Sequence, residues 1–71
     1  AEYIITGSGT ISAQYVTANK CLAEISGSGN IYCHAAEELD AIISGSGNIY
    51  YRGYPEVDQE ISGSGSVKRI D

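Results

Sequence analysis

The sequence is poor in basic residues and has no long apolar run, and each shortage excludes a class of protein. Four lysines and arginines stand against nine acids, which gives a net charge of -5. This balance argues against nucleic acid as a partner and against electrostatic docking on anionic lipid. No apolar run approaches the ~20 residues of a membrane span, and no signal peptide is visible. A processed signal would leave no trace, so these absences leave the compartment open.

Cysteine is also scarce, since Cys21 and Cys33 are the only two. Two cysteines are too few for a disulfide scaffold or a structural zinc site, and their spacing is not CxxC. The spacing favours two small buried side chains, as is common for cysteine. A Cys21–Cys33 bridge in an oxidising compartment is the alternative.

What the chain does contain is one short unit, ISGSGNIY, present four times in slightly different spellings. The leading glycines of the four copies are Gly7, Gly27, Gly45 and Gly63, so the steps are 20, 18 and 18 residues. Self-similarity at a nearly fixed period is typical of a repeat architecture.

Apolar residues stand at even distances from each leading glycine. Two columns hold β-branched residues in every copy: Ile5, Ile25, Ile43 and Ile61, then Ile11, Ile31, Ile49 and Val67. Even spacing and β-branched residues indicate strands. Two glycines per copy, and Pro55 in one of them, argue against a helix in each repeat.

The repeat therefore predicts an all-β fold, a right-handed parallel β-solenoid (β-helix) of about four coils of 18–20 residues. We expect three short sides per coil, with Gly-Ser-Gly at one corner and a bulge or wider turn around Val16 to Lys20. Residues 1–71 form one segment without a polar cap at either end. We therefore expect it to be part of a longer domain, and to stack on further coils or self-associate.

The same residues carry a family resemblance. The repeated ISGSGNIY, followed by YRGYP at residues 51–55 and a last ISGSGSV, resembles the C-terminal part of the head GIN domain of auto-transporter adhesins. The resemblance extends over nearly the whole chain. It implies a right-handed parallel β-solenoid and an extracytoplasmic setting, at the cell surface, in the periplasm or secreted. It implies an adhesion role and brings no catalytic residues with it.

Motifs of catalysis and of metal or cofactor binding do not fit the repeat. The dinucleotide fingerprint needs a third glycine where the four copies have Ser12, Tyr32, Tyr50 and Lys68. The calcium-binding nonapeptide needs an aspartate after its glycines, and none is there. The columns Lys20/Glu38/Glu56 and Leu22/Asp40/Asp58 indicate a solvated acidic wall, with a bridging cation as the alternative. We predict no enzyme, cofactor or metal; the rival hypothesis is a carbohydrate-active enzyme on a β-helix, which would need a deep cleft.

The best candidate for binding is the outward face that follows Gly-Ser-Gly. Strand alternation predicts that six side chains point outward there: Asn30, Tyr32, His34, Asn48, Tyr50 and Arg52. Stacked tyrosines between amides and a guanidinium could bind a neutral glycan or a protein surface. The alternative is that the tyrosines only stabilise the sheet. The sequence thus favours a non-catalytic structural or adhesion module.

Overall fold

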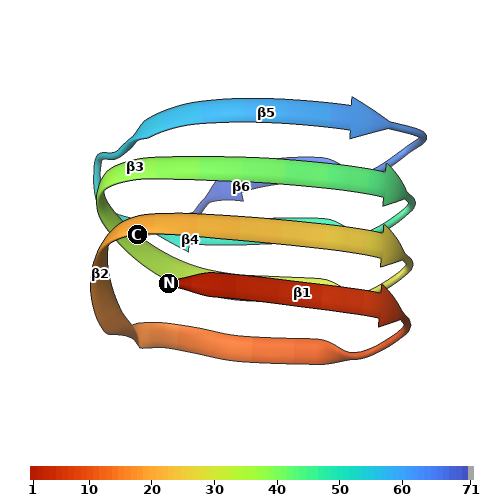
Figure 1. The fold of residues 1–71 in the computed structure, drawn as a ribbon, viewed down its shortest axis with the longest axis horizontal. Helices are drawn as coiled ribbons and strands as arrows, with labels where there is room; N and C mark the ends of the chain where they lie inside the picture. Colours follow the sequence, from red (N-terminus) through yellow and green to blue (C-terminus); the bar gives the residue numbers. More distant parts are fainter. Residues whose placement is uncertain (71) are drawn as a thin grey trace.

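The computed structural model describes residues 1–70, and all their regular elements are β-strands (Figure 1). Every pairing between these strands is parallel. The strands are β1 (Glu2–Gly7), β2 (Thr10–Gly27), β3 (Asn30–Gly45), β4 (Asn48–Arg52), β5 (Glu56–Ser62) and β6 (Ser66–Arg69). No helix that could span a membrane occurs among the described residues.

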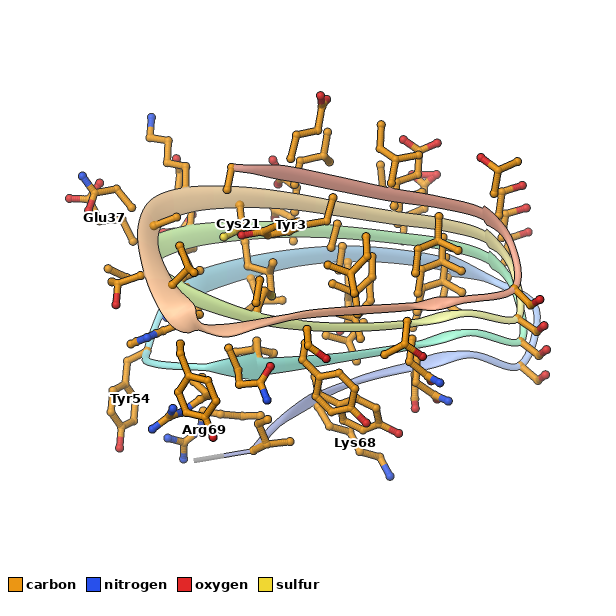
Figure 2. The ribbon with its side chains drawn as sticks, turned by 90° about the horizontal axis from the view of Figure 1, so that it is seen from below. Tyr3, Cys21, Glu37, Tyr54, Lys68 and Arg69 are labelled. Carbon is orange, nitrogen blue, oxygen red and sulfur yellow. The ribbon has the colours of Figure 1, made fainter. Side chains whose placement is uncertain are left out.

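Each strand pairs with the segment one repeat further along the chain. Ile5 lies beside Ile25, Ile25 beside Ile43, and Ile43 beside Ile61. In Figures 1 and 2, β1 crosses the near face, the first half of β2 returns behind it, and the chain then comes forward one step higher. This path is a right-handed turn. The predicted right-handed parallel β-solenoid of about four coils is therefore confirmed.

The coil is flattened, as the view along it shows (Figure 2). Two long walls meet at a sharp end, where the Gly-Ser-Gly units lie, and at a rounded end, around which β2 and β3 run without a break. The sides of a coil are therefore unequal, with the rounded end as a short third side between the two long ones.

The wide first coil is irregular close to the predicted place. The register between β2 and β3 shifts between Ser12 and Thr17, and again between Ala18 and Lys20. Residues 13–16 thus stand opposite Cys33 alone. Tyr15 and Val16 leave the regular columns as a result, and their side chains are 83% and 60% exposed.

The core is a set of aliphatic ladders between the two walls. Ile25, Ile31 and Ile49 are fully buried, and Ile43 is 1% exposed. The inward assignment of both isoleucine columns is therefore confirmed. A column that the sequence analysis did not single out, Tyr3, Ala23 and Ala41, also faces inward, and Ala23 and Ala41 are fully buried.

The two glycines of each Gly-Ser-Gly unit are needed for different reasons. The leading glycine Gly45 has a φ of 134°, which side chains rarely allow. Gly47 has no positive φ, but a Cβ there would lie 2.6 Å from the carbonyl oxygen of Gly29. Because the backbones of adjacent coils approach so closely, their hydrogen bonds continue through the corner. Ser46 N–H donates to the Gly27 carbonyl oxygen, and Asn48 N–H donates to the Gly29 carbonyl oxygen.

Candidate functional site

The outward side chains of the coils lie on two opposite surfaces, the tyrosine wall and the acidic wall. The tyrosine wall is the outward side chains of residues 10–17, 30–34, 48–52 and 66–69, and the acidic wall is those of residues 2–6, 18–26, 36–44 and 56–62. The first carries all six predicted binding residues. Since both walls are built on the same ladders, outward columns on each keep the coil spacing of about 4.8 Å.

Tyr32 on β3 and Tyr50 on β4 form a stacked pair at the centre of the tyrosine wall. The two residues are direct partners in the parallel ladder, and their ring centroids are 5.0 Å apart with 24° between the planes. Both side chains are partly exposed. The predicted outward placement and stacking of the two tyrosines are therefore confirmed.

The asparagine row beside the rings is linked by hydrogen bonds. Asn48 Nδ2 donates to Asn30 Oδ1 over 3.2 Å, and Ser66 Oγ donates to Asn48 Oδ1 over 2.9 Å. These bonds hold the amides in line along the stack. Part of the hydrogen-bonding capacity of the two amides is thus used within the protein, and the asparagine row forms a polar edge beside the rings.

His34 and Arg52 extend the wall toward the rounded end. They are ladder partners, and Thr17 pairs with His34 on the coil before. The Thr17 hydroxyl lies 3.2 Å from His34 Nδ1, a hydrogen bond whose direction depends on the tautomer. The His34 ring also covers Gly53, where a Cβ would meet His34 Cδ2 at 3.1 Å. The histidine is therefore held on two sides, and all six predicted residues lie in one continuous patch.

The sequence analysis missed the aromatic contacts of the cations. The Arg52 guanidinium carbon lies 5.7 Å from the centroid of the Tyr15 ring, and that of Arg69 lies 4.5 Å from the Tyr54 ring. Lys68 is the ladder partner of Tyr50 and is exposed (Figure 2). Lys68 could have been found by extending the tyrosine column one copy further, whereas Tyr15 lies in the irregular first coil.

Charge is divided between the two walls. Every acid among residues 1–70 lies on the acidic wall or at the rounded end within its ranges: Glu2, Glu24, Glu37, Glu38, Asp40, Glu56, Asp58 and Glu60. Its one base, Lys20, pairs with Glu38 at 3.3 Å. Arg52, Lys68 and Arg69 lie in the ranges of the tyrosine wall. The molecule therefore presents one anionic and one cationic-aromatic side.

The acidic wall has a shallow hollow of about 300 Å³ between its last coils. Asp40, Asp58 and Glu60 border it, and all three are exposed to solvent. Among the described residues, no three His, Cys, Asp or Glu side chains gather in a way that could hold a metal ion. The carboxylates at the hollow are thus in contact with water and do not converge in a cleft.

Cys21 and Cys33 are both buried free thiols. Burial raises the pKa of the Cys33 thiol to about 12, and the neighbouring Cys21 adds to the rise. Burial likewise raises the pKa of Cys21, whose sulfur lies 3.8 Å from the His34 carbonyl oxygen. Thiols held neutral are poor nucleophiles. The prediction of two small buried side chains is confirmed, and the bridge is not formed.

Comparison with known proteins gives one match. A family model described as "Putative auto-transporter adhesin, head GIN domain" matches residues 1–55. The match covers the first three coils and both stacked tyrosines, and stops before β5 and β6. No curated protein and no solved structure matches the chain.

Proposed function

Because the chain belongs to the head GIN domain family of auto-transporter adhesins, we propose that it is an extracytoplasmic, non-catalytic module that attaches to its partner through the tyrosine wall. The family is described as an adhesin head domain and not as an enzyme. An adhesin head needs a surface that is rigid before its partner arrives, since ordering side chains on binding costs free energy.

The observation that carries the proposal is the Tyr32–Tyr50 stack. Two stacked rings at 5.0 Å, fixed to neighbouring strands, form a rigid aromatic ridge with hydrogen-bonding groups beside it. A glycan offers the C–H face of a sugar to such rings, and a protein offers its own flat apolar groups. The six binding residues proposed are Asn30, Tyr32, His34, Asn48, Tyr50 and Arg52, with a neutral glycan or a protein surface as partner.

Two other functions receive less support. A carbohydrate-active enzyme needs carboxylates in a cleft, whereas the carboxylates beside the shallow hollow between the last coils are exposed. A bare spacer needs no particular outward residues, and stacking on further coils stays a prediction. Neither hypothesis accounts for the separation of aromatic and acidic side chains onto opposite walls.

The proposal is tested by a glycan array and a pull-down with the parent and with the double variant Tyr32→Ser/Tyr50→Ser. We expect the double variant to lose binding while its thermal melt stays close to that of the parent. Ile42→Ser is the matched control, because Ile42 is 37% exposed on the acidic wall. If the folded double variant keeps the affinity of the parent, the tyrosine wall is not the binding surface.

A further inference from the structure

Two cations that have no counter-charge on their wall lie beside Tyr50 of the stacked pair. Lys68 follows Tyr50 on the next coil, and Arg52 follows it two residues along β4. Neither side chain forms an ion pair with another residue among 1–70. The ranges that make up the tyrosine wall contain no aspartate and no glutamate. A ligand on the rings therefore meets positive charge on two sides.

The Arg52 guanidinium also lies over the ring of Tyr15, a residue of the irregular first coil. Tyr15 is 83% exposed, and the Arg52 guanidinium carbon lies 5.7 Å from its ring centroid. A guanidinium can stack on a ring with its flat face while its edge still donates to an acceptor. Tyr15 is thus a positioning residue that leaves the donor edge of Arg52 free.

We propose that the tyrosine wall binds a glycan whose sugar rings carry carboxylates, that is, a polysaccharide containing uronic acid. This inference rests on the proposed attachment through the tyrosine wall and names a charged glycan in place of a neutral one as its ligand. The aromatic ridge of the Tyr32–Tyr50 pair contacts the apolar C–H groups of a sugar ring. Arg52 accepts the ring carboxylate through paired N–H donors, and Lys68 attracts the carboxylate of a neighbouring unit.

The spacing of the patch fits such a ligand. Two residues along a strand cover about 6.6 Å, and neighbouring coils are about 4.8 Å apart. Tyr32, Tyr50, His34 and Arg52 therefore form the corners of a small rectangle, because both pairs are ladder partners. One sugar ring covers the tyrosine side of this rectangle, and a carboxylate on that ring reaches the Arg52 side.

The net charge of -5 does not oppose an anionic ligand on this wall. The acidic side chains lie on the opposite side of the core from the tyrosine wall, and the molecule measures 19 Å along each of its two shorter axes. Charges are screened within about 8 Å in physiological salt. The net charge therefore gives no ground against a charged partner on the tyrosine wall.

The test compares two forms of one oligosaccharide, a hexameric galacturonate and its fully methyl-esterified form, by titration calorimetry with the full chain and EDTA. Esterification removes the charge and leaves the sugar rings unchanged. We expect the charged form to bind at least about tenfold more tightly, as one charge-assisted hydrogen bond provides. Raising NaCl from about 0.05 to 0.5 M should shrink this difference, since salt screens the pair.

Three variants assign the parts of the site. Arg52→Gln should remove most of the difference in affinity between the charged and esterified forms, and the rest should remain because Lys68 keeps its charge. Tyr15→Ser should reduce the difference partly, because Arg52 keeps its charge but loses its support. Tyr32→Ser/Tyr50→Ser should abolish binding of both forms, as the proposed function requires.

The outcomes separate this inference from the proposed function. Equal binding of both forms by the parent, unchanged in Arg52→Gln, overturns the inference and leaves a neutral glycan as partner. Binding of the charged form that survives loss of both tyrosines, or equal binding of poly-glutamate, also overturns it, because the wall would then only attract anions. Failure of both forms to bind overturns the uronate inference, and the array and pull-down decide the proposed function separately.

Discussion

Gly47 lies against Ile25 of the preceding coil, so closely that a Cβ at Gly47 would be 2.7 Å from Ile25 Cγ2. The leading glycine of the same unit, Gly45, is limited by its φ of 134° as well as by its neighbour, since a Cβ there would lie 2.5 Å from the Gly27 carbonyl oxygen. Gly7 has a φ of 97° but open space around it. These three glycines separate the cost of crowding from the cost of backbone strain.

Alanine at these positions should therefore give graded losses of stability. We expect Gly7→Ala to cost about 1 kcal/mol from φ strain alone, and Gly47→Ala to cost about 1–3 kcal/mol from overpacking. Gly45→Ala should cost the most, since both effects apply. Urea melts of the three variants measure this order. A Gly47→Ala variant that melts like the parent would show that the coils can move apart at the sharp end.

Adjacent isoleucines on β3 offer a matched test of the inward and outward assignment. Ile43 is 1% exposed and Ile42 is 37% exposed. Ile43→Asp should unfold the domain, because an unpaired carboxylate would enter a dry core. Ile42→Asp should cost much less, because its carboxylate stays in water, although it would repel the ladder partners Glu24 and Glu60. Circular dichroism and thermal melts compare the two, and similar losses would contradict the assignment.

The fold could be predicted from the sequence because every coil repeats the same pattern, so that aligning the copies also places the coils on one another. Once Ile25, Ile43 and Ile61 are placed in one column, parallel stacking puts each on the next, and alternation sends Tyr32 and Tyr50 outward together. Each position in a copy thus has the same neighbours, one coil before and one coil after. This is why the core ladders and the aromatic stack were both predicted correctly.

Column counting fails where the repeat itself is broken. Residues 13–16 stand opposite Cys33 alone, so no count from Gly7 could place Tyr15 beside Arg52. Spacing also shows that a glycine is needed at Gly47 but does not distinguish positive φ from close packing. The division of charge could have been found by applying the outward columns to both walls.

The buried thiols predict a loss of stability in alkali. Burial raises the pKa of Cys33 to about 12, whereas an unfolded cysteine titrates near 8.5. Between these values the unfolded chain has released a proton that the folded protein retains, so the free energy of unfolding falls as pH rises. The stabilising effect of the protonated Cys33 thiol is complete below about pH 8.5 and is lost by about pH 12. Between these values the free energy of unfolding falls by up to about 1.4 kcal/mol per pH unit.

The measurement is urea unfolding of the reduced protein at pH 7, 9 and 10.5, for the parent and for Cys33→Ala. The other side chains are the same in both proteins, so the difference in slope reports the Cys33 thiol together with its effect on Cys21. We expect the parent to lose about 1–2 kcal/mol more than Cys33→Ala between pH 9 and 10.5. Parallel pH profiles would mean that Cys33 reaches solvent in the folded state. In that case the inner face of the first two coils would be more open than its full burial indicates.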